Sequence, residues 1–290
     1  MSRVGLPLSS IEPPAPTSLP LVLVTRPQAQ ADDWVARLQA LGLRAVALPL
    51  LGIAAAADPA PLQAAWLGLA GLACGQQPAR LPAVVMFVSP SAVDRFFGLK
   101  PADLAWPPGV LAAGTGPGTR RALRAAGVPD EAVVTPPDQL AQFDSEALWA
   151  VLRPRLQWAG KAVWIVRGEG GRDWLADTLR QQGAAVHFVE AYRRTGPVLD
   201  ALAQAALQQA LAQPSACCWL FSSSEAVGHL PALAPAVHWA AAAALASHPR
   251  IAAAARQLGF GRVRQVSPSP EAVAKALREW PVAWREWPAA

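Results

Sequence analysis

An internal repeat constrains the fold of this 290-residue chain more than any other feature of its sequence. The string LVTR at residues 23–26 recurs as WIVR at 164–167, and FVSPSAV at 87–93 recurs as FSSSEAV at 221–227. The copies keep the same order while their spacing shrinks slowly along the chain. Ordered self-similarity of this kind indicates a duplicated structural unit whose loops have been trimmed. We therefore predict two domains, which fits a chain of this length.

Each copy alternates short apolar or β-branched runs with stretches of helical periodicity. In the first such stretch the apolar side chains recur at three- and four-residue steps, at Ala31, Trp34, Val35, Leu38 and Leu41. This alternation predicts βαβ units around parallel sheets, which is the α/β fold class. The alanine-rich residues 237–246 favour a helix, but the repeat aligns them with an apparent strand at 109–113. We expect a strand there.

Charge and apolar patterning limit the function classes open to this chain. Lys and Arg number 25 against 20 Asp and Glu, and nearly all of the basic residues are arginine. An arginine excess indicates an anionic partner or reflects a GC-rich genome. The basic residues are scattered rather than striped, so nucleic acid is not expected. The longest alanine-rich run, 236–246, is too short to span a bilayer, and no membrane segment is expected.

The cysteines and the N-terminal segment point to a cytoplasmic location. Cys74, Cys217 and Cys218 have no metal-chelating spacing and are expected to be small buried apolar residues. The first twenty residues hold five prolines and no apolar signal, so we expect a disordered tail rather than an export sequence. The C-terminal tryptophans, Trp280, Trp284 and Trp287, could form a docking stripe or a packed terminus.

Two glycine-rich turns follow apparent strands. Residues 167–172 read RGEGGR and residues 114–119 read GTGPGT, each before a helical pattern. Their free N–H groups could hold an anion, or the turns could simply be tight. Neither has the full Rossmann fingerprint, and the second lacks the lysine of a P-loop. A nucleotide-dependent enzyme is therefore not expected.

Hydroxyl side chains follow equivalent strands in both copies, at residues 89–91 and 222–224. Serines at such positions are either helix N-caps or ligand contacts, because open α/β sheets bind ligands at the carboxyl ends of their strands. No histidine lies in a nucleophile motif, and no metal site is indicated. Tyr192 is the single tyrosine, and it could act as a proton donor or as a packing residue.

Six motifs together resemble bacterial uroporphyrinogen-III synthases. They are Thr25-Arg26-Pro27, Pro49-Leu50, the segment 87–93, Gly116-Pro117-Gly118-Thr119, Val166-Arg167-Gly168 and Glu190-Ala191-Tyr192-Arg193-Arg194. Each motif is weak alone, but the ordered set, which covers about residues 20 to 280, is specific.

The resemblance implies an architecture of two similar, parallel-sheet (flavodoxin-like) domains joined by a two-stranded β-ladder. Residues 20–50 and 197–283 would form a discontinuous outer domain. Residues 51–196 would form an inserted domain, and the ligand would bind between the two. Residues 1–19 and 284–290 would be tails.

The resemblance also implies an activity and its partners. The enzymes of this family close hydroxymethylbilane, a linear tetrapyrrole with eight carboxylates, into a ring while inverting the last pyrrole through a spiro intermediate. No cofactor and no metal would be required. The protein would be a cytoplasmic monomer that receives its substrate from hydroxymethylbilane synthase, in the pathway to haem.

Site residues carry over from the family one position at a time. Tyr192 matches the proposed catalytic acid. The substrate-binding set combines these matches with strand-end positions and consists of Arg26, Ser89, Thr119, Arg167, Gly168, Ser222, Ser223 and Arg250. The outer domain departs from the family where a Gly-Pro-Thr-Thr-like turn reads His248-Pro249-Arg250-Ile251, which removes a hydroxyl contact that Arg250 could replace.

A second function class remains open at this point. The same two-domain clamp could be a non-catalytic sensor that binds a tetrapyrrole or another polyanion and signals to a partner. The altered turn at His248 and the tryptophan-rich tail are the features that favour it.

Overall fold

The computed structural model describes residues 19–71, 81–137, 140 and 143–279. These residues divide into two compact units, and each is considered by itself. Unit 1 combines the described residues of 1–50 and 198–290, and unit 2 is formed by 51–197. The expected N-terminal tail (apart from Leu19), the three C-terminal tryptophans and Cys74 lie outside the described residues. Among the residues described, none of the helices is both long enough and apolar enough to cross a bilayer.

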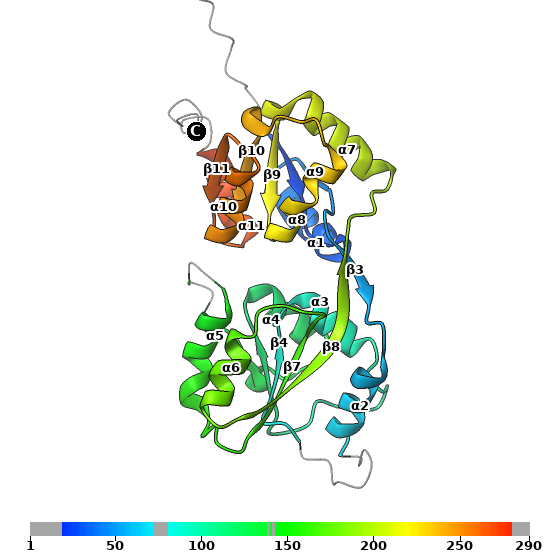
Figure 1. Ribbon diagram of the computed structural model, residues 1–290, viewed down its shortest axis with the longest axis vertical. Coiled ribbons are helices and arrows are strands. Elements are labelled where there is room, and N and C mark those ends of the chain that lie inside the picture. The colour runs from blue at the N-terminus through cyan, green and yellow to red at the C-terminus, as the bar shows by residue number, and fades with distance from the viewer. Residues whose placement is uncertain (1–18, 72–80, 138–139, 141–142, 280–290) are drawn as a thin grey trace, which may run out of the picture. The chain divides into compact units, whose positions relative to one another are not determined.

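Unit 1 is built on a five-stranded parallel sheet (Figure 1). Its order is β11-β10-β9-β1-β2. The strands are β1 (Leu21–Val24), β2 (Ala45–Ala47), β9 (Cys217–Phe221), β10 (Ala243–Ala246) and β11 (Arg262–Gln265). If the five strands are renumbered 1 to 5 in chain order, the sheet reads 2-1-3-4-5 from β2 to β11. This is the strand order of flavodoxin-like doubly wound sheets.

Helices cover both faces of this sheet, as a buried parallel sheet requires. One face packs against α1 (Gln28–Ala40) and α11 (Pro270–Arg278). The other packs against α7 (Ala201–Ala212), α8 (Ser224–Gly228), α9 (Leu230–Leu233) and α10 (Pro249–Gln257). Short 3-10 turns, η3 (Pro214–Ala216) and η4 (Trp239–Ala241), precede β9 and β10.

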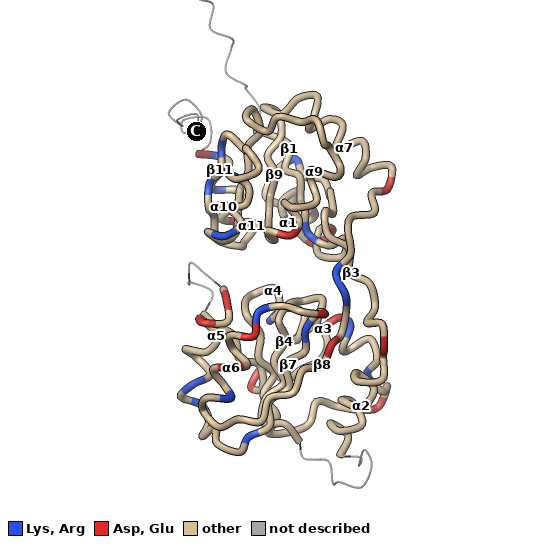
Figure 2. The backbone as a smooth tube through the Cα atoms, viewed as in Figure 1, with Lys and Arg blue, Asp and Glu red and all other residues tan. Residues whose placement is uncertain are grey.

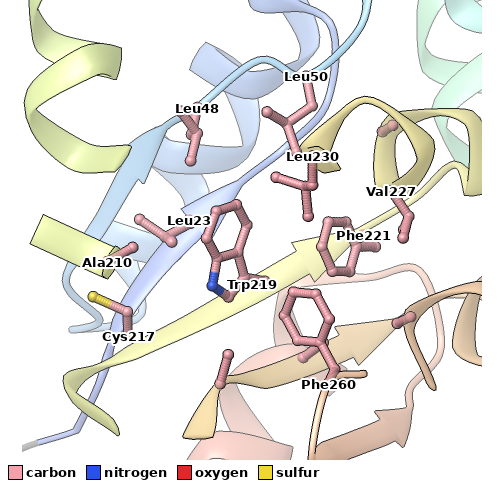
Figure 3. Packing of buried hydrophobic residues seen from close by; sticks show 14 of the residues in the cluster. Leu23, Leu48, Leu50, Ala210, Cys217, Trp219, Phe221, Val227, Leu230 and Phe260 are labelled. Carbon is pink, nitrogen blue, oxygen red and sulfur yellow. The ribbon is translucent and has the colours of Figure 1, made fainter. Parts of the chain in front are cut away.

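Aromatic rings fill the second of these faces (Figure 3). The Trp219 ring, from the central strand β9, stacks on Phe221 with centroids 5.9 Å apart and meets Phe260 edge-on at 6.0 Å. Trp239 stacks on Phe260 at 5.1 Å. Offset and edge-on ring pairs add to the stabilisation that comes from burial alone. This cluster anchors the middle of the sheet, whose strand ends carry the predicted site residues of unit 1.

Unit 2 is built on a six-stranded sheet of order β3-β8-β7-β4-β5-β6. The strands are β3 (Gly52–Ala55), β4 (Val84–Phe87), β5 (Leu111–Gly114), β6 (Val133–Val134), β7 (Ala162–Gly168) and β8 (Ala185–Thr195). All are parallel except β3, an edge strand that pairs antiparallel with the end of β8. When β3 is left out and β7, β8, β4, β5 and β6 are renumbered 1 to 5 in that order, this sheet also reads 2-1-3-4-5.

The helices of unit 2 also form two layers (Figure 1). One face carries α2 (Ala60–Leu69), α3 (Pro90–Phe97) and α4 (Pro117–Ala125). The other carries α5 (Ser145–Leu152) and α6 (Trp174–Gln181). The 3-10 turns η1 (Asp130–Ala132) and η2 (Arg153–Arg155) precede β6 and follow α5. The predicted α/β class with two parallel-sheet domains is thereby confirmed.

The two sequence copies do not coincide with the two units. Strands β1 and β2 of the first copy share a sheet with β9, β10 and β11 of the second. Conversely, β4, β5 and β6 of the first copy share a sheet with β7 and β8 of the second. Each copy therefore contributes its first two strands to one unit and its last three to the other, which makes both sheets alike.

The alanine-rich run at 237–246 becomes a strand only over its last four residues, β10. Residues 239–241 form the 3-10 turn η4 instead, so the expected strand was too long. All four β10 residues are buried between helices on both faces. Small side chains fit such a sandwiched strand, and this packing overrides the helical preference of alanine.

A buried hydroxyl links two neighbouring strands of unit 1. Thr25, directly after β1, donates from Oγ1 to the carbonyl of Leu220 on β9 at 2.8 Å. Because a buried hydrogen bond contributes about 1 kcal/mol net, we expect Thr25→Val to lower the free energy of unfolding by about that amount. Urea titration would measure it. The control is Thr178→Val, whose exposed hydroxyl bonds within its own helix, and an equal loss in both variants would contradict the prediction.

Candidate active site

Every predicted site residue except Tyr192 lies at or beyond the carboxyl end of a strand, or in the helix turn that follows. Tyr192 lies inside β8, opposite Gly168 at the end of β7. Unit 1 carries Arg26, Ser222, Ser223 and Arg250, and unit 2 carries Ser89, Thr119, Arg167, Gly168 and Tyr192. Because parallel strands end at the same edge of a sheet, each set lies along one edge of its own unit. Within unit 2 the structure also brings three of these residues into direct contact.

The strand register of unit 2 places Tyr192, Gly168 and Ser89 in a row across three neighbouring strands. Gly168 of β7 pairs with Tyr192 of β8. Phe87 of β4 pairs with Val166 of β7, so Ser89 lies level with Gly168, two residues further on along each strand. The glycine, which has no side chain, therefore stands between the tyrosine and the serine.

A β-bulge turns Tyr192 toward this row. The pairing of β7 with β8 shifts between Arg167 and Gly168, so that Ala191 is the extra residue on β8. Bulges commonly re-aim a side chain next to a functional site. Ala191 and Tyr192 are consecutive in the chain, yet both join the same hydrophobic cluster against α2 and α3. Without the bulge, strand alternation would send the two side chains to opposite faces.

The Tyr192 side chain is only 4% exposed, and its ring crosses over Gly168. A Cβ atom at Gly168 would lie 2.7 Å from Cε2 and 2.8 Å from Cζ of the tyrosine. Across the glycine, the phenol oxygen lies 3.1 Å from Oγ of Ser89, within hydrogen-bond distance. Gly168 thus provides the space through which the phenol reaches the next strand.

Ser89 is the N-cap of α3, as the sequence allowed. Its Oγ accepts the N–H of Ala92 at 3.2 Å, and Pro90 occupies the first helical position, where its missing N–H costs nothing. The same oxygen lies within hydrogen-bond distance of the Tyr192 phenol, so one atom both caps the helix and contacts the tyrosine. Sequence reasoning singled out both residues but had no signal for their contact.

The glycine-rich turn before α4 lies beside the start of α3. A Cβ atom at Gly118 would contact Pro90 at 3.4 Å, and one at Gly116 would lie 3.0 Å from Phe143. The Thr119 side chain is buried, with its methyl group packed against Gly114. Thr115, which the sequence did not single out, donates to the carbonyl of Val88 at 3.3 Å and so ties the two strand ends together.

The two equivalent strand-end arginines each lie over an aromatic ring. The Arg26 guanidinium lies 4.4 Å from the Trp34 ring centroid, and that of Arg167 lies 4.0 Å from the Phe188 centroid. Arg167 also pairs with Asp173 at 2.5 Å across its own turn, and its side chain is only 12% exposed. In this structure Arg167 therefore fastens the loop before α6.

At the turn that departs from the family pattern, the side chain of His248 caps the following helix. His248 is the N-cap of α10, and its Nδ1 accepts the N–H of Arg250 at 3.1 Å. The Arg250 side chain is exposed in the first turn of that helix. Nearby along the same sheet edge, Ser223 caps α8 by accepting the N–H of Glu225 at 3.2 Å, while Ser222 precedes it. The imidazole therefore does the capping that a hydroxyl does at Ser223.

The two described cysteines are buried, protonated thiols rather than reactive thiolates. Burial raises the pKa of both Cys217 and Cys218, which keeps them protonated, and they lie inside β9. Among the described residues, His, Cys, Asp and Glu form no group of three or more that could hold a metal ion. Basic and acidic residues are interspersed along both units (Figure 2), with local pairs such as Arg172 and Glu146 at 3.1 Å.

Sequence comparisons identify relatives of known class. A family model described as uroporphyrinogen-III synthase HemD matches residues 32–275. The uroporphyrinogen-III synthase of Escherichia coli (strain K12) is 32% identical over 194 residues, which cover 65% of this chain and 71% of that protein. The enzyme of the same name from Salmonella typhimurium (strain LT2) is 31% identical over 187 residues, with 63% and 69% covered.

Solved structures share the fold. A mutant uroporphyrinogen III synthase from the extremely thermophilic bacterium Thermus thermophilus superposes with a TM-score of 0.51 at 18% identity, covering 92% of this chain and 99% of that one. Uroporphyrinogen-III synthetase from Helicobacter pylori 26695 gives 0.51 at 14% identity, with 92% and 100% covered. At these identities the likeness concerns the fold alone. With a family model spanning most of its length and two bacterial relatives above 30% identity, the chain belongs to the uroporphyrinogen-III synthase family.

Proposed function

We propose that this chain cyclises hydroxymethylbilane to uroporphyrinogen III, acting as a cyclising hydro-lyase that inverts the last pyrrole ring. Beside its family membership, the observation that carries the proposal is the contact between the Tyr192 phenol and Ser89 at the carboxyl edge of the unit 2 sheet. A hydroxyl pair at this edge suits an acid-assisted loss of water. Incubating the full chain with freshly made hydroxymethylbilane and identifying the product isomer tests it.

Tyr192 serves as the general acid in the first step. Its phenolic proton passes to the terminal hydroxyl of the substrate, and the carbon–oxygen bond breaks with both electrons leaving on oxygen. Water departs. The lone pair of the adjacent pyrrole nitrogen stabilises the resulting azafulvene cation, and Tyr192 is left as a phenolate.

Ring closure then follows from how the substrate is held. The far pyrrole attacks the cation through its substituted carbon and forms a spiro intermediate, whose fragmentation and reclosure invert that ring. Loss of a proton from the joined ring carbon restores the aromatic pyrrole and returns a proton to Tyr192. One water is lost overall, and the steps require no redox partner. Because the free substrate also closes unaided to the uninverted isomer, positioning is the enzyme's main contribution.

The carboxylates of the substrate are held by the candidate residues other than Tyr192, Ser89 and Gly168. Arg26 and Arg250 in unit 1 supply positive charge, while Ser222 and Ser223 supply hydroxyl groups at neighbouring strand ends. In unit 2, Thr119 lies in the first turn of α4, where helix N–H groups favour anions. Arg167 shapes this edge by fastening its loop, and its charge adds to the local field.

The finer points of the proposal concern the setting of the enzyme. We expect a cytoplasmic monomer that takes hydroxymethylbilane directly from hydroxymethylbilane synthase, since the free substrate cyclises to the wrong isomer. Family membership favours this enzyme over a non-catalytic tetrapyrrole sensor.

A polycarboxylate substrate should make binding sensitive to salt. Raising the ionic strength from about 0.1 M to 1 M shortens the screening length from about 10 Å to about 3 Å, so we expect KM to rise severalfold while turnover falls less. Arg250→Gln should raise KM at low salt and weaken its salt dependence. The control is Arg153→Gln. Arg153 is an exposed arginine in η2, directly after α5, and is not among the predicted site residues. A KM that does not respond to salt would contradict carboxylate recognition.

A further inference from the structure

Ser89 already uses one lone pair of its hydroxyl in a fixed way. Its Oγ accepts the N–H of Ala92 as the N-cap of α3, at 3.2 Å. A hydroxyl can accept two hydrogen bonds and donate one. The proton of Ser89 is therefore still available, and the Tyr192 oxygen lies 3.1 Å from Oγ. Among the described residues, Ser89 is the hydrogen-bond partner that the structure shows for the phenol.

The direction of this hydrogen bond decides whether Tyr192 can act as an acid. If the phenol donated to Ser89, its proton would point toward the serine and away from a substrate hydroxyl. If Ser89 donates, the phenol keeps its own proton for transfer, and the serine proton stays in place to stabilise the phenolate left behind. In either arrangement the phenol oxygen lies beside the N-terminal turn of α3, an eight-residue helix whose dipole favours the negative charge of a phenolate.

We propose that Ser89 is a positioning residue that donates its proton to the Tyr192 oxygen, fixing the direction of the phenolic O–H and stabilising the phenolate. This inference rests on the proposed function, because it assigns a role within the same reaction. It differs from a substrate-binding role for Ser89, since the serine acts through Tyr192. The glycine at position 168 is part of the arrangement, because the phenol passes over it to reach Ser89.

Three variants separate positioning from capping. Glycine is nearly as good an N-cap as serine, so Ser89→Gly removes the hydroxyl at little cost to α3. Ser89→Thr keeps both the cap and the donor. The matched control is Ser269→Gly, because Ser269 caps α11 in the same way, accepting from Ala272 with Pro270 at the first helical position.

Kinetics give the first readout. Loss of one hydrogen bond to a charged transition state should lower the turnover of Ser89→Gly by about tenfold, with KM changed by less than about twofold. Ser89→Thr should stay within about threefold of the wild type, and Ser269→Gly should match it. A rise in KM with unchanged turnover in Ser89→Gly would show a substrate-binding serine and overturn the inference.

Spectroscopy gives a second readout that does not depend on activity. Tyr192 is the only tyrosine in the chain, so tyrosine labelled with carbon-13 at Cζ gives a single resonance from this phenol. We expect Ser89→Gly to shift that resonance, and Ser89→Thr and Ser269→Gly to leave it nearly unchanged. An unmoved resonance in folded Ser89→Gly would overturn the positioning role. Failure of the wild-type chain to form the inverted isomer would instead overturn the proposed function, whatever the resonance does.

Discussion

Tyr192→Phe is expected to lower turnover on hydroxymethylbilane by roughly 10²-fold or more, the low end of the range for general acid catalysis. Phenylalanine keeps the buried ring on β8 that packs against α2 and α3, and it removes only the phenolic hydroxyl. Folding should therefore survive, and KM should change little. Stopped assays of substrate consumption with analysis of both isomers would measure the effect.

The isomer ratio gives the same variant a second signature. Ionisation precedes the choice of isomer, so slow ionisation on the enzyme allows released substrate to cyclise in solution, and the uninverted product rises. Circular dichroism matching the wild type is the control for folding. Near-normal turnover and isomer ratio in folded Tyr192→Phe would show that the phenol is not the acid, and a bound water or the substrate's own carboxylates would remain as candidates.

Gly168→Ala should be nearly as damaging, although it changes no group that reacts. The new methyl group would lie 2.7 to 2.8 Å from Cε2 and Cζ of Tyr192, so the ring must move. The atoms displaced are at the phenolic end of the ring, and a shift of about 1 Å at a reacting group can cost about 10²-fold in rate. Overpacking should also lower the free energy of unfolding by about 1–3 kcal/mol. Turnover assays and urea titration on one preparation would measure both.

Two comparisons test the cause of that loss. Gly228→Ala, at the end of α8, meets nothing within 4 Å and should not reduce activity or stability. In the double variant with Tyr192→Phe, the loss of turnover should be no greater than that of the more impaired single variant, because one change displaces the phenol that the other removes. Additive losses would indicate that Gly168 acts on the substrate rather than on Tyr192.

The sequence predicted the fold class because the repeat and the alternation of strand and helix are properties of local segments. The strings at 23–26 and 164–167 became the equivalent strands β1 and β7, and those at 87–93 and 221–227 mark the ends of β4 and β9. The length of β10 was not predictable, because alanine has no strand preference of its own. Burial on both faces of the sheet decided it.

The site was only partly predictable, and the reason is geometric. Ser89 and Tyr192 were each identifiable from their motifs, but 103 residues separate them. Their contact depends on the order of β8, β7 and β4, on the bulge at Ala191, and on the absence of a side chain at Gly168. The one available signal was Gly168, the glycine that follows Arg167 at the end of a strand, and from the sequence it was interpreted as a ligand contact. The aromatic stacking of Arg26 and Arg167 had no sequence signal, because Trp34 and Phe188 meet them only in the folded units.

The most direct test of the account is the identity of the isomer formed from hydroxymethylbilane. Freshly prepared substrate is mixed with increasing amounts of the full chain, and the products are oxidised to porphyrins and separated. Heat-denatured protein gives the spontaneous background, which is the uninverted isomer. We predict that the inverted isomer, uroporphyrinogen III, increases in proportion to the enzyme and replaces the uninverted one. Only the uninverted isomer at every protein concentration, formed at the background rate, would contradict the account.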